Sequence, residues 1–478
     1  MDHRVIEELI GKHDRVARSA VVNSSEHQGH TVVYVVPYEA PAENRVEEWL
    51  QVYDRLYTAT PSQELGDNFT GWNSTYDRTP IPLAHMRNWR DNTVARIREL
   101  SPRRVLEIGA GNGLVLTKLA PHCDEYWATD LSPVAIAELE AQVKATPDLA
   151  SKVILRAQPA DDFRDVPAGY FDTIVINSVV QLFPSADYLL SVLRGARRAL
   201  APGGALFLGD IRDLRTLPYL QTAAALTGHD GDDSVAVLRR AERIVARSEE
   251  LLLHPAFFSA STIGDLGFGG VDTQLKRSPC LNELTRHRFD VVLHSDDASP
   301  TNVAHCPVVT FQSDLLDVLP GVLTGPVRIT GIPNRRILGE ITAYQALRRG
   351  EPRAARQALG EAPGPSIEPH RLIDLAETAG AQAVLTPDHA DAGLFEAIFL
   401  PRLPGRTALT GTYRCDGATE GPLAEIPAAT RRKALLANEL HEWLRERLPR
   451  DVLPAAVIPV DTLPTTSPST PGGPHGSR

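Results

Sequence analysis

The chain has 478 residues, 23% of them charged, and a formal net charge of −11 at pH 7. This length allows two or three domains, and the negative charge argues against nucleic acid as a main partner, because phosphate binding needs a basic surface. The four scattered cysteines form neither a metal-ligand pair nor a disulfide framework, so we expect no metal and a reducing, cytoplasmic location. No apolar run approaches the ~18 residues of a membrane span, and we expect no membrane partner.

The first segment, residues 1–41, has helical spacing followed by two β-rich runs at 19–23 and 31–37. A helix and a hairpin are too small to fold alone, so we expect this segment to pair with a distant part of the chain. From residue 42 to 100 the pattern becomes helical and aromatic, which predicts a helical cap.

A loop of the predicted cap, residues 67–76, mixes aromatic side chains with Asn and Ser. Binding residues are often carried on loops. We therefore interpret Trp72, Asn73 and Tyr76 as facing a substrate, with simple packing of the cap on the main fold as the alternative.

The most informative stretch, residues 104–116, is a short apolar strand, a Gly-x-Gly-x-Gly turn and the start of a helix. Gly109, Gly111 and Gly113 allow positive φ angles and close approach of a ligand. Such loops hold nucleotide-like ligands at the carboxyl end of a first parallel strand. Leu114 stands where a dinucleotide fingerprint needs glycine, and the carboxylate of Glu107 favours a cationic ligand over a pyrophosphate. The loop resembles the S-adenosylmethionine (SAM) site of class I methyltransferases.

Strands and helices alternate after this loop, with strands predicted at 126–130, 153–157, 171–177 and 205–210 and a helix at 186–200. This alternation indicates a doubly wound parallel sheet. A mostly helical insertion covers 211–260. Strands at 271–276 and 289–294 follow without room for a crossover helix, which predicts an antiparallel pair. We therefore expect an α/β, class I (Rossmann-like) methyltransferase fold with a seven-stranded, mostly parallel sheet over residues 42–297.

A SAM site needs a backbone turn, an acceptor for the ribose hydroxyls, a clamp for adenine and a neutral or anionic lining near sulfur. Asp130 ends the second strand, where a carboxylate can accept both hydroxyls, although helix capping is the alternative. Asp161 follows the third strand and can accept from the adenine amino group. The predicted cofactor-binding residues are Glu107, Gly109, Gly111, Gly113, Asp130, Leu131, Ala160, Asp161, Asn177 and Ser178.

The sequence identifies no clear general base. Methyl transfer requires alignment more than strong acid–base catalysis, but an ammonium acceptor must first lose a proton. The candidate catalytic residues are His85, Tyr76 and Asp210, each of which also has an ordinary structural interpretation.

Six segments in the right order resemble one family, the methyltransferase domains embedded in nonribosomal peptide synthetase adenylation domains. They are WLQVYDRLY (49–57), GWNSTY (71–76), VLEIG (105–109), NSVVQLFP (177–184), GDIR (209–212) and NELTR (282–286). The resemblance implies SAM-dependent methylation, usually of the α-amine of an amino acid held as a thioester on a carrier protein. The expected partners are an aminoacyl- or peptidyl-carrier protein or other synthetase subunits, and an amino acid as the small-molecule substrate.

The flanks resemble the two ends of an adenylation domain's small C-terminal subdomain, which would be α+β and split by the methyltransferase. We assign its first part to residues 1–41 and its second part to 425–466, with a disordered tail at 467–478 and an accessory α/β region at 298–424. No counterpart of the large nucleotide-binding half is present, and the family's terminal lysine has no match. We expect no adenylation activity.

Two alternatives stay open. One is a methyltransferase acting on a free small molecule at nitrogen, oxygen or carbon, and the other is a docking protein with a vestigial SAM fold.

Overall fold

A computed structural model describes residues 3–24, 30–38, 46–47, 49–51, 54, 65–228, 233–313, 325–361, 364–401, 408–415, 419, 421–449, 452–460 and 463. Much of the first part of the predicted helical cap, residues 42–64, and the predicted tail at 467–478 lie outside these residues. The chain forms two compact units. The larger spans Arg45–Ile426, and the smaller combines Met1–Asn44 with Pro427–Arg478.

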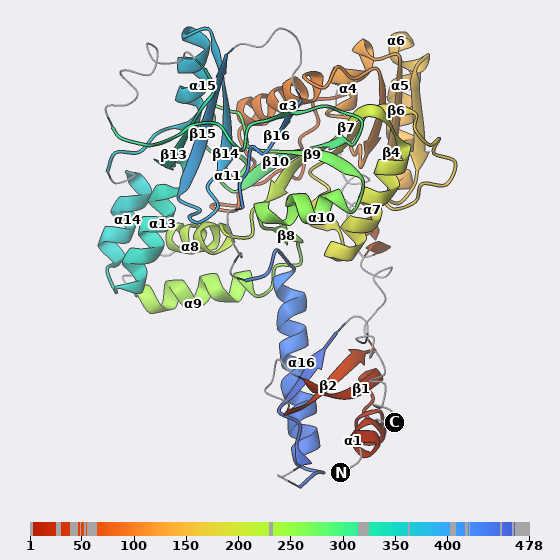
Figure 1. The fold of residues 1–478 in the computed structure, drawn as a ribbon, viewed down its shortest axis with the longest axis vertical. Helices are drawn as coiled ribbons and strands as arrows, with labels where there is room; N and C mark the ends of the chain where they lie inside the picture. Colours follow the sequence, from red (N-terminus) through yellow and green to blue (C-terminus); the bar gives the residue numbers. More distant parts are fainter. Residues whose placement is uncertain are drawn as a thin grey trace, which may run out of the picture. The chain divides into compact units, whose positions relative to one another are not determined.

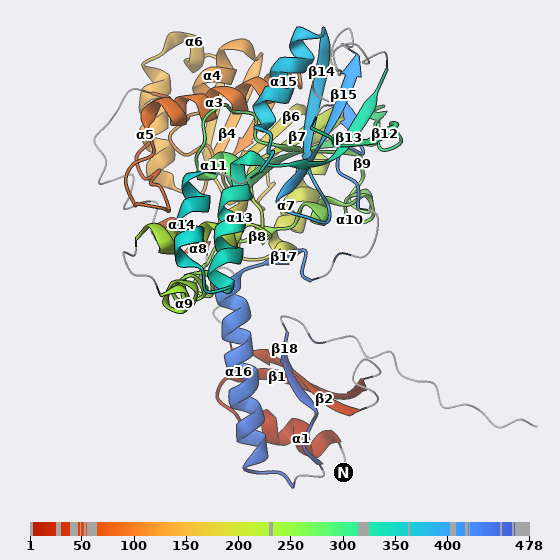
Figure 2. The ribbon, with the colours of Figure 1, turned by 90° about the vertical axis from the view of Figure 1, so that its left-hand side faces the viewer.

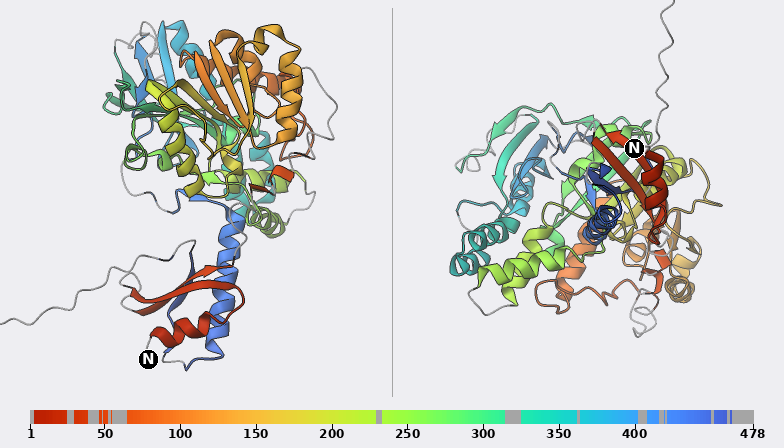
Figure 3. Two further views of the ribbon diagram at one scale, coloured as in Figure 1. Left: turned by 90° about the vertical axis from the view of Figure 1, so that its right-hand side faces the viewer. Right: turned by 90° about the horizontal axis from the view of Figure 1, so that it is seen from below.

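The larger unit is built on a seven-stranded sheet, visible in Figure 3 as neighbouring strands coloured from orange to green. The strands are β3 (Arg104–Ile108), β4 (Glu125–Asp130), β5 (Val153–Ala157), β6 (Phe171–Asn177), β7 (Leu200–Arg212), β9 (Phe268–Leu275) and β10 (Arg288–Ser295). Their order is β5-β4-β3-β6-β7-β10-β9. The first five pair in parallel, and β10 is antiparallel to both of its neighbours. The predicted seven-stranded, mostly parallel sheet with a closing antiparallel pair is confirmed.

Helices cover this sheet because the parallel strands are apolar on both faces. They are α3 (Leu83–Arg98), α4 (Leu116–Leu119), α5 (Pro133–Lys144), α6 (Pro147–Ala150) and α7 (Ala186–Ala199). Ile97, Leu116 and Leu139 share one buried core with Val105 and Phe207 of the sheet. Serine hydroxyls cap two of these helices at their N-termini, Ser132 before α5 and Ser185 before α7. The caps fix the residue at which each helix begins, at the edge of the sheet where the glycine loop lies.

The predicted helical insertion between β7 and β9 contains α8 (Leu217–Thr227), α9 (Ser234–Val245) and the short α10 (Ala260–Gly264). Within it, β8 (Leu252–Leu253) pairs antiparallel with β17 (Ala424–Glu425). A single turn of helix, α11 (Glu283–Arg286), connects β9 to β10.

Residues 298–426 contribute a second sheet, order β12-β13-β15-β14, to the larger unit. Its elements are β12 (Val308–Thr310), β13 (Val327–Pro333), β14 (Ala381–Pro387) and β15 (Leu394–Pro401), with α13 (Arg335–Arg348), α14 (Pro352–Gly360) and α15 (Pro369–Thr378). Only β12 and β13 pair in parallel, so the expected α/β alternation is a mostly antiparallel sheet. Figure 2 shows α13 and α14 beside α8 and α9, and these four helices share one apolar core. The region predicted as accessory is therefore packed against the methyltransferase insertion within one unit.

The smaller unit is formed from the two ends of the chain, coloured red and blue in Figure 1. It contains α1 (His3–Ile10), β1 (Val16–Ser24), β2 (His30–Pro37), α16 (Pro427–Arg445) and β18 (Ala456–Pro459). The β1–β2 hairpin is antiparallel, and β18 joins β2 in parallel. Ile10, Val33 and Val35 share a core with Leu440 and Leu444 of α16, which supplies the distant partner that the N-terminal segment needs.

A search of the described helices finds none that combines the length and the apolar character of a membrane-spanning helix.

Candidate active site

The glycine loop follows β3 directly and is held against the end of β4. The amides of Gly109 and Ala110 both donate to the carbonyl oxygen of Thr129, at 2.8 and 3.0 Å. Gly109 has φ +80°, and a Cβ there would lie 2.3 Å from a methyl group of Val179. A side chain at this position is excluded by both backbone strain and contact. Glycine at position 109 therefore allows the loop to lie in close contact with the end of the sheet.

Asp130, the last residue of β4, is bonded to the loop that it faces. Its Oδ2 accepts from the amide of Gly111 at 2.8 Å, and its Oδ1 accepts from the amide of Ser132 at 2.9 Å. Burial raises the pKa of this carboxyl above its ordinary value, although the two backbone hydrogen bonds oppose the rise. Each carboxylate oxygen can accept a second hydrogen bond, so the arrangement leaves acceptor capacity for a diol.

Glu107, in β3, is a buried acid at the base of the loop, with an exposed fraction of 3%. Its Oε2 accepts from the hydroxyl of Tyr126 at 2.8 Å. Burial raises the pKa of Glu107 to about 8, and the neighbouring Asp130 acts in the same direction. Among the described residues no ion pair to Glu107 is found. A buried acid without a cationic partner suits a site for a cationic ligand.

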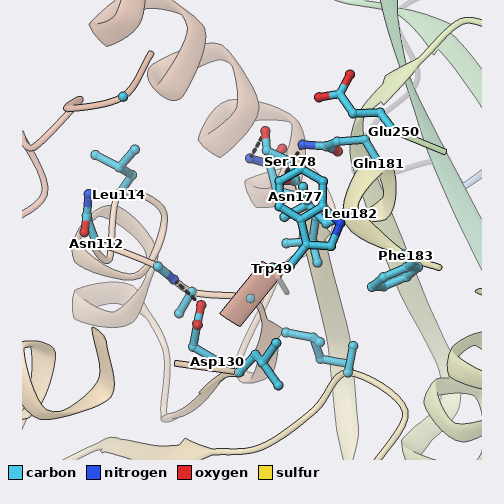
Figure 4. A pocket seen from close by; sticks show the side chains of 18 of the residues that line it. Trp49, Asn112, Leu114, Asp130, Asn177, Ser178, Gln181, Leu182, Phe183 and Glu250 are labelled. Carbon is cyan, nitrogen blue, oxygen red and sulfur yellow. Dashed lines mark hydrogen bonds between the residues drawn. The ribbon is translucent and has the colours of Figure 1, made fainter. Parts of the chain in front are cut away.

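A cavity of about 380 Å³ lies over the carboxyl ends of β3, β4 and β6. The sequence-predicted residues in its lining are Glu107, Gly109, Gly111, Asp130, Leu131, Ala160, Asn177, Ser178, Trp72 and Asn73. Figure 4 shows Asp130 and Asn112 at one end of this pocket and Asn177, Ser178 and Gln181 at the other. The structure thus brings together strand ends that are separated by up to 70 residues of sequence.

Five predicted site residues lie outside the lining of this cavity: Gly113, Asp161, Tyr76, His85 and Asp210. Gly113, with φ +70°, allows the chain to pass Leu139, whose methyl group a Cβ would meet at 2.9 Å. Asp161 is exposed and accepts from the hydroxyl of Tyr188 at 2.8 Å. Tyr188 itself lines the cavity, so Asp161 is connected to the site only indirectly, by its hydrogen bond with the Tyr188 hydroxyl.

Tyr76 was predicted as a substrate contact or base, but its hydroxyl donates to Glu340 of α13 at 2.7 Å. Burial raises the pKa of Tyr76 well above its ordinary value, so the hydroxyl stays protonated near neutral pH and is not available to take a proton. Arg286 and His287 contact the same carboxylate, at 2.8 and 3.0 Å. This cluster ties the 70–76 loop to α13. His85 lies in the first turn of α3 and is also outside the lining.

Asp210 was predicted as a base. Its side chain is instead fully buried, with 0% exposure, and is held by ion pairs. It pairs with Arg288 and lies 3.6 Å from the Lys276 Nζ. It also accepts from Trp89 Nε1 at 3.0 Å and from Ser178 Oγ at 2.7 Å. The nearby cations outweigh burial and lower the pKa of Asp210 to about 2, so this carboxylate is too weakly basic for proton abstraction.

The carboxylate of Asp210 therefore positions three cavity-lining side chains, Ser178, Trp89 and Arg288. Ser178 and Asp210 both adopt left-handed backbone conformations, with φ +58° and +66°, at the ends of adjacent strands. Such conformations persist only where the surroundings enforce them, and they gather at functional sites.

Several lining residues were not predicted. They include Gln181, Tyr188, Arg212, Glu250, Glu283 and Arg288. The quoted motifs NSVVQLFP, GDIR and NELTR contain three of them, Gln181, Arg212 and Glu283, so the family resemblance held a signal for those positions. Glu250 had no such signal, because it lies in an irregular segment before β8.

Comparison with known proteins indicates the class of protein. Residues 106–206 match the profile of a family described as "Methyltransferase domain". Over 96% of its length the chain is 34% identical to a probable non-canonical nonribosomal peptide synthetase, CymA, of Salinispora arenicola, of which it covers 6%. Over 97% of its length it is 33% identical to chondramide synthase of Chondromyces crocatus, of which it covers 13%. The chain thus spans a small part of these relatives.

Among solved structures, the N-methyltransferase NodS from Bradyrhizobium japonicum is 18% identical, with a TM-score of 0.33. The match covers 52% of this chain and 97% of that one.

The sheet order, the glycine loop and the family match define a class I methyltransferase whose cofactor is SAM. Over nearly its whole length the chain is similar to segments of nonribosomal peptide synthetases, as a methyltransferase domain embedded in such a synthetase would be.

The residues present fit SAM. Glu107 is a buried acid without an ion-pair partner among the described residues, and Asp130 retains acceptor capacity beside the amide of Gly111. In addition, the buried Oδ1 of Asn177 lines the cavity and has no hydrogen-bond partner among the described residues. These three groups supply the anionic and hydrogen-accepting lining that a sulfonium compound with an amino group and a diol requires.

The raised pKa of Glu107 predicts a pH-dependent affinity for SAM. Below pH 8 this carboxyl is mostly protonated in the free protein, and a cation favours the ionised form, so binding releases a proton. Affinity is expected to rise by up to about tenfold per pH unit from pH 6 towards pH 8, and then to level off. Calorimetry in two buffers of different ionisation enthalpy measures the proton released. Glu107→Gln removes this release, and proton uptake or no exchange by the wild type at pH 6.5 would contradict the prediction.

Proposed function

We propose that this methyltransferase transfers a methyl group to the α-amine of an amino acid tethered to a peptidyl carrier protein. The observation that carries the proposal is the alignment of 96–97% of the chain, both units included, with segments of nonribosomal peptide synthetases. In such enzymes the amino acid is a thioester, which has a free amine and no free carboxylate. A carrier protein is the corresponding partner.

One end of the cavity is lined by Arg212 and Arg288, and we call it the acceptor end because the methyl acceptor would bind there. The charges at this end support a tethered substrate. Arg212 and Arg288 both line the cavity, and a free amino acid would present a carboxylate to them. Each guanidinium already has an acidic partner, because Arg288 pairs with the buried Asp210 and the Arg212 Nε lies 2.8 Å from Glu250. A neutral thioester leaves both pairs intact, whereas a free carboxylate would compete with them.

The residues of the chain act by binding and alignment. Gly109, Gly111 and Asp130 hold the cofactor end, while Trp72 and Trp89, whose ring centroids are 4.8 Å apart, wall the acceptor end and exclude water. When bound, SAM would supply a methyl carbon on a positively charged sulfur. The α-ammonium first loses a proton to solvent, its lone pair forms the new N–C bond, and the electron pair of the broken S–C bond leaves with the sulfur; the methylated ammonium product loses its extra proton to solvent after release. Alignment and desolvation of the two reactants account for much of the rate of such a displacement.

The test is a comparison of acceptors by mass spectrometry. A panel of aminoacyl-carrier proteins and the matching free amino acids are incubated with SAM, and the rate and site of methylation are measured. We expect a mass gain of one methyl on the α-amine of carrier-bound amino acids and slow turnover of the free acids. Faster methylation of a free acid would overturn the tethered substrate, and methylation at oxygen or carbon would overturn the α-amine.

A further inference from the structure

We propose that Gln181 and Glu250 form the subsite that binds the amine of the acceptor, with each side chain accepting one of its N–H bonds. The inference deepens the proposed function, because it names the residues that select nitrogen as the methylated atom. Both side chains line the cavity. The main-chain amide of Leu251 donates to the main-chain carbonyl oxygen of Gln181 at 2.8 Å, so the segments that carry Gln181 and Glu250 lie side by side. Figure 4 shows both side chains at the end of the pocket that also holds Asn177 and Ser178.

Gln181 presents a fixed acceptor without a partner. It lies in the 3-10 turn Val180–Leu182 and is 7% exposed. Its Nε2 donates to the carbonyl oxygen of Ser178 at 2.7 Å, which fixes the plane of the side-chain amide. Its Oε1 is buried and has no hydrogen-bond partner among the described residues. An unpaired buried acceptor is unfavourable, so a donor from a ligand is the expected partner.

Glu250 presents a fixed carboxylate. Arg212, at the end of β7, holds its Oε2 through the 2.8 Å contact with Nε, and the side chain retains 26% exposure. The other charged groups at this end are Arg288, Asp210 and Glu283. Arg288 is paired with Asp210, and both oxygens of Glu283 accept from Thr75. Glu250 therefore keeps one oxygen, Oε1, outside its ion pair with Arg212, whereas each oxygen of Glu283 already accepts a hydrogen bond.

Two fixed acceptors match a primary amine and discriminate against a hydroxyl. A neutral primary amine has two N–H bonds for the two acceptors and keeps its lone pair for the methyl carbon, whereas a hydroxyl has one donor and leaves one acceptor unpaired. A monomethylated amine also has one N–H bond when neutral. The subsite therefore predicts that the enzyme stops after one methyl group.

The test measures binding without turnover. Calorimetry with S-adenosylhomocysteine present compares pairs of non-hydrolysable aminoacyl-pantetheine amides, one member carrying an α-amine and the other an α-hydroxyl. In the wild type we expect the amine to bind at least about tenfold more tightly. Glu250→Gln and Gln181→Leu should each reduce this ratio towards one while leaving affinity for S-adenosylhomocysteine and the thermal unfolding midpoint unchanged. Glu249→Gln is the matched control, since Glu249 is exposed and outside the cavity lining.

A ratio near one in the wild type, or a ratio unchanged in both variants, would overturn the subsite. The result is separable from the test of the tethered substrate. If free amines are methylated faster than carrier-bound ones, the carrier is excluded and the amine subsite still predicts the amine-to-hydroxyl ratio. The number of methyl groups in the product gives a second check, because a dimethylated product formed as fast as the monomethylated one contradicts the two-acceptor arrangement.

Discussion

Replacing Asp210 by alanine is expected to lower the free energy of unfolding by about 3–5 kcal/mol, because it leaves the buried Arg288 without its ion-pair partner, while Lys276 keeps Asp290 at 2.9 Å. Both cations are at most 6% exposed in their side chains, so water cannot take the place of the carboxylate. Urea-induced unfolding followed by circular dichroism measures the loss. The same substitution should reduce methyl transfer, since Ser178 and Trp89 lose the acceptor that positions them.

Asp124→Ala provides the matched control for this substitution. Asp124 also pairs with an arginine, Arg103, but both side chains are more than half exposed. Exposed ion pairs contribute little to stability, so this variant should unfold close to the wild type. Equal effects of the two substitutions would show that the Asp210 cluster is not a structural anchor.

The second large effect is expected at the cofactor end, where Asp130→Ala should weaken SAM binding by about 100-fold. The substitution removes the acceptor for a diol and also the hydrogen bonds that hold the amides of Gly111 and Ser132. Hydrogen bonds to charged groups contribute about 1.5–3 kcal/mol each, and about 1.4 kcal/mol corresponds to a tenfold change. Calorimetric titration with S-adenosylhomocysteine measures the change without turnover.

Asp148→Ala is the control for the loss of one negative charge, because Asp148 is exposed at the first turn of α6, outside the cavity lining. It should bind the cofactor as the wild type does. An Asp130→Ala variant with wild-type affinity would remove the assignment of Asp130 to the cofactor site.

The grouping of Gly109, Gly111 and Asp130 around one cavity was predictable because the signals for it are local in the sequence. Gly109, Gly111 and Asp130 each lie within three residues of the end of a strand, and the carboxyl ends of parallel strands meet at one edge of the sheet. The parallel sheet was predictable for the same reason, because the alternation of strands and helices is also a local pattern in the sequence. A local pattern of this kind specifies both the element and the position of its last residue.

The acceptor end was harder to predict because its side chains come from distant and irregular segments. The position of Asp210 at a strand end was foreseen, but its inward orientation depends on Lys276 and Arg288, more than 60 residues further along the chain. Tyr76 was assigned to the substrate because nothing near it in sequence indicates Glu340 as its partner. Glu250 precedes a strand of only two residues and carries no periodic pattern.

The pairing of β18 with β2 has a consequence for the order in which the chain folds. Ala456 pairs with Val32 across a separation of about 420 residues. Closing so long a disordered loop is entropically unfavourable and slow, but a folded larger unit shortens the effective loop. The larger unit should therefore fold first. Until the C-terminal segment leaves the ribosome, the edge of β2 that receives β18 is open, and Val33 and Val35 lack the apolar cover of α16. During synthesis this hairpin edge is therefore exposed to wrong pairing.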